Sequence, residues 1–126
     1  MNVVDSSGWL EYFADGPNAA FFAPAIEATR ELLVPTLSLY EVFKRVLQQR
    51  GEGQALQAVA LMQQGQIVDL TAAIALSAAK ASIERRLPTA DSIMLITAQT
   101  HGATFWTQDA DFDSVEGVKY VARKNK

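Results

Sequence analysis

The sequence predicts an α/β domain with a central parallel β-sheet that helices cover on both faces. Short apolar runs alternate with helical patterns along the chain, and this alternation is typical of a parallel sheet. The length of 126 residues suits one domain, so we expect a single domain over residues 1–126. The hydrophobic content of 49% is enough for a sizeable core.

The elements are justified in order by their turn and capping residues. Ser6 or Ser7 can cap the first helix, Asn18 can cap the second, and Pro24 should interrupt or kink the second helix. Gly51 follows the third helix, where glycine commonly ends a helix. Strands are expected at residues 2–4, 32–35, 67–70, 103–107 and 118–121, and helices at about 8–14, 19–30, 38–50, 54–64, 72–86 and 90–101.

The third helix has two interpretations at its start. Ser38 and Glu41 have the S-x-x-E spacing of a capping box, in which the glutamate side chain returns to the first backbone N–H of its own helix. Alternatively, Ser38 holds the helix start while Glu41 faces a site. The two roles compete for one carboxylate, and the sequence leaves both open.

Composition and charge exclude several classes of protein. The net charge of −3 and the pI near 5.0 provide no basic surface for nonspecific duplex binding, although a bound metal could supply positive charge locally. The absence of cysteine excludes disulfides, thiolate metal sites and cysteine nucleophiles. No signal peptide or membrane-length apolar run is visible, so we expect a cytoplasmic protein without a membrane partner.

Acidic residues fall where the predicted elements meet. Asp5 follows the first strand, Glu41 and Asp91 lie in first turns of helices, and Asp109 follows a late strand, with Asp111 as a fifth candidate. In open α/β sheets, ligands bind at the carboxyl ends of the strands. If these carboxylates converge, they raise one another's pKa, and a hard divalent cation is the usual relief. Such a site favours metal-assisted hydrolysis of a phosphodiester.

Each acid also has a purely local explanation. Asp5 could cap the helix that follows it, and Asp91 could complement a helix dipole. Asp109, Asp111 and Asp113 could form a solvated turn. Each local explanation is reasonable for its own residue. The occurrence of acids at all of these element junctions together argues against them as a full explanation.

Three segments together carry a resemblance to a known family. They are VVDSSGWLEYF, VPTLSLYEVFKRVLQQRG and LPTADSIMLITAQTHGATFWTQDADF. They contain a D-S-S motif, a glutamate opening a helix after a strand, a P-x-x-D helix start and a T-x-D-x-D-F motif. In this order and spacing, the chain resembles the PIN-domain ribonucleases, and most closely the VapC-type toxins of bacterial toxin–antitoxin pairs.

The resemblance implies an activity, a cofactor and partners. It implies that Asp5, Glu41, Asp91 and Asp109 coordinate Mg²⁺ or Mn²⁺, with Asp111 at an acidic position that varies within the family. Ser6 and Thr107 match positions that line the site by hydrogen bonding. The resemblance further implies an endoribonuclease toxin that forms a homodimer, and a VapB-like antitoxin whose chain wraps the toxin and plugs the acidic site. We expect the RNA substrate to be single-stranded or looped.

The basic and aromatic side chains each have more than one interpretation. Lys44 and Arg45 could contact RNA phosphates or form ion pairs with Glu41 on the same helix. Arg85, Arg86 and the basic tail at residues 123–126 could contact phosphates or be solvated surface. Five aromatics lie within 14 residues, and we hypothesise that some of them form a groove for an antitoxin helix: Trp9, Tyr12, Phe13, Phe21 and Phe22.

Two other functions are consistent with an acidic α/β domain. A phospho-acceptor signalling domain of flavodoxin-like topology would need an acidic pair after the first strand and an acceptor aspartate after a middle strand. Here Asp5 is a single acid, and the second strand ends at Val34-Pro35. A catalytically silent PIN-like binding module is the other alternative, and the presence of acids at all four main positions argues against it.

Overall fold

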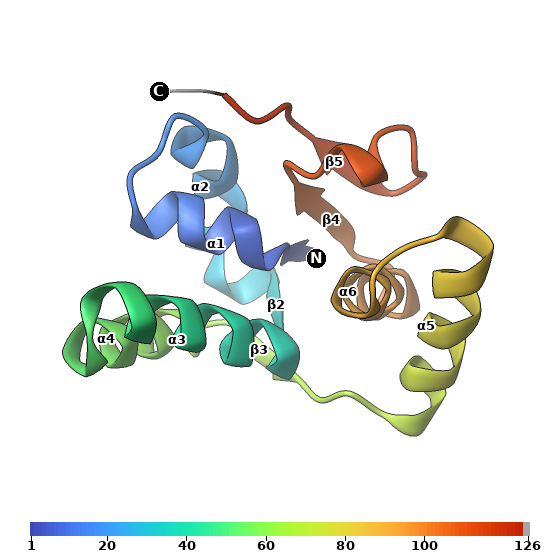
Figure 1. Ribbon diagram of the computed structural model, residues 1–126, viewed down its shortest axis with the longest axis horizontal. Helices are drawn as coiled ribbons and strands as arrows, with labels where there is room; N and C mark the ends of the chain where they lie inside the picture. The colour runs from blue at the N-terminus through green and yellow to red at the C-terminus, as the bar shows by residue number, and fades with distance from the viewer. Residues whose placement is uncertain (125–126) are drawn as a thin grey trace.

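Five parallel strands form one sheet in the order β3-β2-β1-β4-β5 (Figure 1). The computed structural model describes residues 1–124; Asn125 and Lys126, the end of the predicted domain and of its basic tail, lie outside the described residues. The strands are β1 (Asn2–Val4), β2 (Leu32–Pro35), β3 (Gln66–Val68), β4 (Thr104–Thr107) and β5 (Val118–Tyr120).

Helices connect the strands and cover both faces of the sheet. They are α1 (Ser6–Phe13), α2 (Ala19–Glu27), α3 (Thr36–Arg50), α4 (Glu52–Met62), α5 (Ala72–Arg85) and α6 (Thr89–Thr100), with short 3₁₀-helices η1 (Thr29–Glu31) and η2 (Ala110–Phe112). Within the described part of the chain, none of the helices has the length and apolar character needed to span a bilayer.

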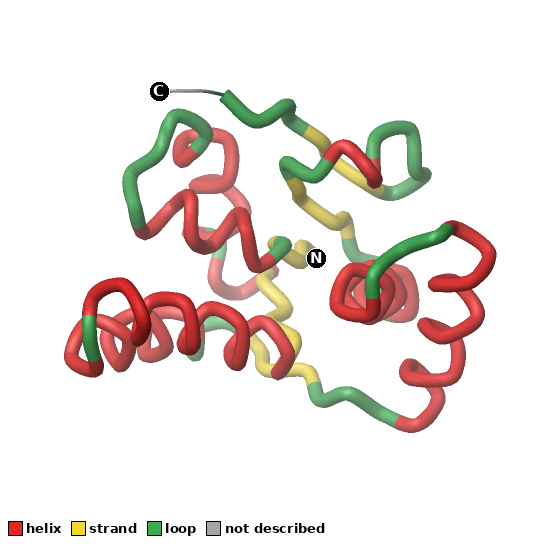
Figure 2. The backbone as a smooth tube through the Cα atoms, in the orientation of Figure 1, coloured by secondary structure: helices red, strands yellow, loops and turns green. Residues whose placement is uncertain are grey.

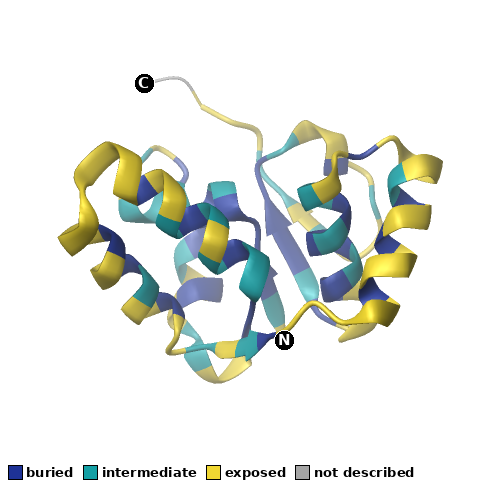
Figure 3. Ribbon diagram, turned by 60° about the horizontal axis from the view of Figure 1, so that its bottom comes forward, coloured by how far each residue is buried: buried dark blue, intermediate teal, exposed yellow. Residues whose placement is uncertain are grey.

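Alternating side chains of the strands build two separate cores. In β1, Val4 packs with the core under α1–α4, whereas its neighbour Val3 packs with the core under α6 and η2. Phe105 and Trp106 of β4 divide in the same way, as the twofold periodicity of a strand requires. The buried strands lie between the two groups of helices (Figure 3). The predicted fold class is therefore confirmed.

The strand order places a topological switch point between β1 and β4. From β1 the chain builds outward through β2 and β3, and it then crosses back to place β4 on the other side of β1. Asn2 pairs with both Leu32 of β2 and Thr104 of β4. In open α/β sheets, ligands bind outside the carboxyl ends of the strands at such a point, which here means the ends of β1 and β4.

The crossover from β4 to β5 is a loop with the single turn of η2, and the sequence predicted no helix there (Figure 2). Two other local features differ from the interpretations drawn from the sequence. Helix α2 continues through Pro24 and ends at Glu27, earlier than expected. The capping box does not form, because α3 begins at Thr36 without a side-chain cap, and buried Ser38 donates its hydroxyl to the Met94 sulfur at 3.2 Å.

Candidate functional site

Five carboxylates gather at the carboxyl edge of the sheet, around the switch point. Parallel strands end at the same edge, and the helices that follow them begin there, so residues distant in sequence meet. Asp5 follows β1 directly, and Asp109 and Asp111 follow β4. Glu41 lies on the second turn of α3, and Asp91 lies in the first turn of α6. We refer to these five residues as the acid cluster.

Asp5 is a buried carboxylate whose orientation is set by hydroxyl groups. It occupies the N-cap position of α1, but its side chain makes no capping hydrogen bond. Its Oδ2 instead accepts hydrogen bonds from Thr107 Oγ1 at 2.9 Å and from Ser7 Oγ at 3.3 Å. Burial raises the pKa of Asp5 above its usual value, and the charges of Asp109 and Glu41 raise it further, whereas the bond from Thr107 opposes this shift.

Glu41 is held by α1 rather than by its own helix. Ser6 Oγ donates a hydrogen bond of 2.7 Å to Glu41 Oε1, which joins the first turn of α1 to α3. This contact replaces the capping box that the local spacing suggested. Consequently the glutamate is directed toward the crevice between α1 and α3, on the same side as Asp5.

Asp91, Asp109 and Asp111 form the tightest part of the cluster. One carboxylate oxygen from each lies within 4.8 Å of the others. Asp109 accepts a hydrogen bond from the backbone N–H of Asp111 at 2.9 Å, and its own N–H donates to Thr107 Oγ1 at 3.0 Å. The Thr107 hydroxyl thus contacts both Asp5 and the loop after β4, which carries Asp109 and Asp111.

Asp91 lies at the electrostatic centre of the cluster. Burial raises its pKa first, and the charges of all four other acids add to the shift, to a value of about 7. Within residues 1–124, none of the five carboxylates forms an ion pair with a basic side chain. The protein itself therefore leaves this concentration of negative charge uncompensated.

The donor set fits a hard divalent cation. Carboxylate oxygens are the ligands that Mg²⁺ takes in proteins, usually one or two of them together with water. Asp91, Asp109 and Asp111 are near enough to share one ion, and Asp5 interacts electrostatically with both Asp91 and Asp109. A cation here would remove the repulsion that raises the pKa of Asp91.

The predicted phosphate-contact residues are exposed and lie in two places. Lys44 and Arg45 project from α3 beside Glu41, and neither forms the predicted ion pair with Glu41 in the described structure. Arg85 and Arg86 lie at the carboxyl end of α5, where Arg86 adopts a left-handed conformation with φ of 56°. The suggested contact of these four residues with RNA stays a prediction.

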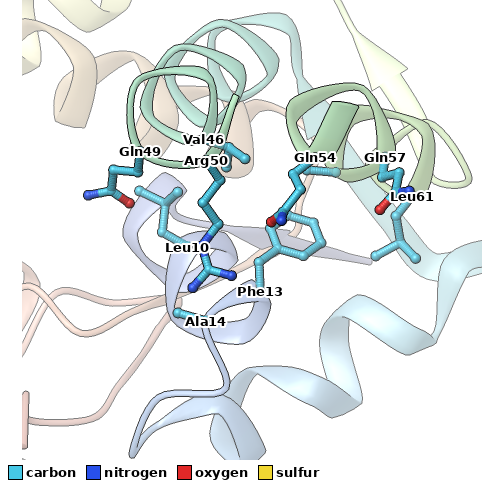
Figure 4. A pocket seen from close by; sticks show the side chains of 10 residues that line it. Leu10, Phe13, Ala14, Val46, Gln49, Arg50, Gln54, Gln57 and Leu61 are labelled. Atoms are coloured by element: carbon cyan, nitrogen blue, oxygen red, sulfur yellow. The ribbon is translucent and has the colours of Figure 1, made fainter. Parts of the chain in front are cut away.

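The aromatic segment contributes mainly to the core and partly to a groove. Trp9 and Phe22 are fully buried, and Phe21 packs against Trp106 with ring centroids 5.3 Å apart. Phe13 stacks on Trp9 and also lines a groove of about 310 Å³ between α1, α3 and α4 (Figure 4). This apolar groove is lined by Leu10, Phe13, Ala14, Val46, Ala58 and Leu61, with Gln49, Arg50, Gln54 and Gln57 around it.

Two buried amides near the cluster, Asn18 and Gln108, were not predicted from the sequence to support the site; Asn18 was expected to cap α2, but its side chain makes no capping hydrogen bond. Asn18 Nδ2 donates to Gln108 Oε1 at 2.9 Å and to the Ala122 carbonyl at 3.0 Å. Gln108 Nε2 donates to the Ser7 carbonyl at 3.4 Å. Together they fasten the loop that carries Asp109 to α1 and α2. Gln108 lies inside the T-x-D-x-D-F motif, and that position was the one available signal.

Solved structures with a similar fold include bacterial toxins and their complexes. A toxin–antitoxin complex from Klebsiella pneumoniae aligns with a TM-score of 0.78 and 23% identity, over 94% of this chain and 96% of that chain. VapC20 from Mycobacterium tuberculosis, described as a sarcin–ricin loop cleaving toxin, aligns with a TM-score of 0.75 and 16% identity, over 92% and 95%. VapBC2 from Rickettsia felis, bound to a promoter DNA fragment, aligns with a TM-score of 0.73 and 11% identity, over 96% and 97%.

The identities of these structures are low, so the likeness shows a shared fold. It excludes the flavodoxin-like alternative, because in that topology the first strand lies between the second and third, whereas here β1 lies between β2 and β4. No curated protein sequence matches the chain. A family model described as the PIN domain matches residues 3–118. The resemblance to PIN domains is therefore confirmed, and the chain belongs to the PIN-domain family.

Proposed function

We propose that this protein is a Mg²⁺- or Mn²⁺-dependent endoribonuclease that acts as a toxin and is neutralised by a cognate VapB-like antitoxin. The observation that carries the proposal is the acid cluster: five carboxylates from distant parts of the chain meet at the switch point without a basic partner among the described residues. The toxins with the same fold support the functional class, and RNA is the proposed substrate.

The protein's own residues have distinct tasks in this proposal. Asp91, Asp109 and Asp111 form one side of the metal site, while Asp5 and Glu41 form the other. Thr107 orients Asp5, and Ser6 orients Glu41, so both carboxylates are fixed before substrate arrives. When bound, the divalent cation activates water for attack and stabilises the charge that develops on the phosphodiester.

The apolar groove is the proposed site of the antitoxin. Its lining comes from three helices and presents apolar side chains at its base, a surface suited to the apolar face of an amphipathic helix. Of the five aromatics that we considered for this role, Phe13 lines the groove directly. The hypothesis that aromatic side chains form the antitoxin groove is therefore narrowed to Phe13, together with the groove residues of α3 and α4.

We further propose that the protein forms a homodimer through α5. Leu76 and Ile83 of this helix are 74% and 82% exposed. They are seven residues apart and thus share one helix face. Large apolar side chains with this exposure suit contact with a second apolar surface, and an equivalent α5 of another copy provides one.

Cleavage of RNA by the purified protein tests the proposed function. We expect cleavage of single-stranded RNA that requires Mg²⁺ or Mn²⁺ and stops with EDTA. Asp91→Asn should reduce the rate by at least about 100-fold, since even residues that only support metal ligands are worth about 10- to 100-fold. The matched control is Asp69→Asn, an exposed carboxylate after the edge strand β3, which should cleave at the parental rate.

Folding of both variants is checked by circular dichroism and thermal melting. At pH 8, where Asp91 is ionised, Asp91→Asn should melt no lower than the parent, because the substitution removes a charge from a repulsive cluster. Equal cleavage by the parent and Asp91→Asn would exclude the acid cluster as the active site. A stably folded parent that binds RNA without cleaving it would instead support the silent binding module.

A further inference from the structure

A second hollow lies on the other side of α3 from the apolar groove. It has a volume of about 420 Å³ and lies between the start of α1, at Ser6 and Ser7, and the face of α3 that carries Tyr40, Lys44, Arg45 and Gln48. We refer to it as the polar hollow. Its volume lies within the range of about 300–1,000 Å³ that is usual for small-molecule sites.

The polar hollow opens onto the acid cluster. Glu41 lines it together with Ser6, and these are the two residues joined by the 2.7 Å hydrogen bond described above. A molecule in the hollow would therefore touch the same side chains that fix one edge of the proposed metal site. The hollow is therefore continuous with one edge of the proposed metal site.

Two cations in the hollow have no carboxylate partner in the described structure. Lys44 and Arg45 lie three and four residues after Glu41, at the spacing that favours ion pairs within a helix, yet neither pairs with it. Both side chains are exposed at the rim. Cations held beside a negatively charged centre suit a polyanion that must approach that centre, because they offset its repulsion.

Tyr40 supplies the aromatic surface of the hollow. Its side chain is 61% exposed, so it contributes little to either core. The Lys44 ammonium lies 5.7 Å from the centre of its ring. An exposed aromatic ring next to unpaired cations is the combination with which proteins bind unpaired nucleotides, the base stacking on the ring and the phosphate contacting the cations.

We propose that the polar hollow is a subsite for one unstacked nucleotide of the RNA, adjacent to the phosphodiester that is cleaved. The base stacks on Tyr40, and Lys44 and Arg45 contact the flanking phosphate. Tyr40 and these cations bind and position the strand and take no part in bond cleavage. This inference rests on the proposed ribonuclease function, and it assigns the substrate contacts of that same site.

The test measures RNA binding separately from RNA cleavage. A fluorescein-labelled single-stranded oligoribonucleotide is titrated with the full chain carrying Asp91→Asn, and binding is followed by fluorescence anisotropy at two salt concentrations. Adding Tyr40→Ala should weaken binding about 5- to 100-fold, as loss of one base–aromatic stack does. Adding Tyr40→Phe should preserve binding, because the ring remains.

The cations are tested by their effect on salt dependence. Lys44→Gln and Arg45→Gln should each weaken binding and lower the slope of log affinity against log salt by about one. The matched control is Lys80→Gln on the exposed face of α5, which should change neither quantity. In the cleaving parent, Tyr40→Ala should raise KM more than it lowers kcat.

The outcomes separate this inference from the proposed function. If the parent cleaves RNA and Tyr40→Ala changes neither binding nor KM, the subsite is wrong while the ribonuclease stands. If the parent fails to cleave RNA but Tyr40→Ala weakens binding, the ribonuclease is wrong while the nucleotide subsite stands. Absence of RNA binding, or an effect of Tyr40→Ala on antitoxin binding alone, would overturn the subsite.

Discussion

The apolar groove and the polar hollow flank the same helix, yet they have opposite chemistry. Val46 and Arg50 of α3 face the groove, whereas Tyr40, Lys44 and Gln48 face the hollow. Leu10 of α1 borders both. The groove is of the kind that binds a folded peptide segment, and the hollow is of the kind that binds a charged, extended strand.

The difference shows how one helix can serve two partners. Residues of an α-helix that are three or four positions apart share a face, so α3 presents different faces to the two cavities. The acid cluster lies near the N-terminal end of α3, because Glu41 is close to the start of that helix. Glu41 also lines the polar hollow. The groove contains no member of the acid cluster, so an antitoxin that also plugs the cluster would need a further segment beyond the one in the groove.

The largest effect expected on antitoxin binding comes from placing a charge in the apolar groove. Leu61→Glu should weaken antitoxin binding by at least about 30-fold, the loss typical of a binding hot spot, and should leave RNA cleavage unchanged. Leu61 is already 37% exposed, so the protein should still fold. The antitoxin is taken as the small protein encoded beside the toxin gene, and affinity is measured by isothermal titration calorimetry.

Leu56→Glu is the matched control for this experiment. Leu56 lies on the same helix, is 54% exposed and does not line the groove. It should bind antitoxin within about threefold of the parent, since surface substitutions rarely change a free energy by more than about 0.5 kcal/mol. If both variants bound equally well, the groove would not be the antitoxin site.

An intermediate effect is expected on the oligomeric state when α5, which lines neither cavity, is changed. Leu76→Glu should convert a dimer into a monomer at concentrations of tens of micromolar, as measured by sedimentation velocity, because a buried charge opposes a self-complementary apolar contact. Leu56→Glu should remain dimeric. A parent that sediments as a monomer at these concentrations would disprove the dimer.

The smallest expected effect is a shift in thermal stability with pH. The folded protein holds a proton on Asp91 up to about pH 7, whereas the unfolded chain releases it near 3.8. This contribution to stability is fully present below the unfolded pKa and is lost as the pH rises through 7. The metal-free protein should therefore gain a few degrees in melting temperature between pH 8 and pH 6.

Divalent metal sharpens this prediction, because it competes with the proton. Millimolar Mg²⁺ or Mn²⁺ should raise the melting temperature more at pH 8 than at pH 6. Asp91→Asn should weaken both the dependence of melting temperature on pH and its increase with metal, and Asp69→Asn should retain both. Differential scanning calorimetry of the three proteins measures the effect, and parallel pH profiles for the parent and Asp91→Asn would contradict it.

Much of the architecture could be predicted because its signals are local or periodic. The alternation of strands and helices identified a parallel sheet, and acids at element junctions pointed to one edge of it. Strand order depends on which distant segments pair, so the position of β4 beside β1 was not predictable from these patterns. No helix was predicted between the last two strands, and that segment is a loop apart from the single 3₁₀ turn of η2.

Glu41 illustrates where local reasoning fails. Its spacing from Ser38 matches a capping box, but burial of Ser38 against Met94 and the hydroxyl of Ser6 lead to a different contact. Both competing partners are more than 30 positions away in sequence. Tyr40 and Gln108 were overlooked for the same reason, since the exposure of one and the burial of the other follow from tertiary packing.

The hydrogen bond between Thr107 and Asp5 spans 102 positions of the chain, and it has a consequence for biosynthesis. Asp5 and β1 are translated first, but β1 lies in the middle of the sheet and must wait for β4 to fill its open side. A nascent chain that lacks β4 and η2 also lacks Asp109 and Asp111. The ribosome that makes this protein therefore carries a chain with an incomplete acid cluster for most of the time that elongation takes.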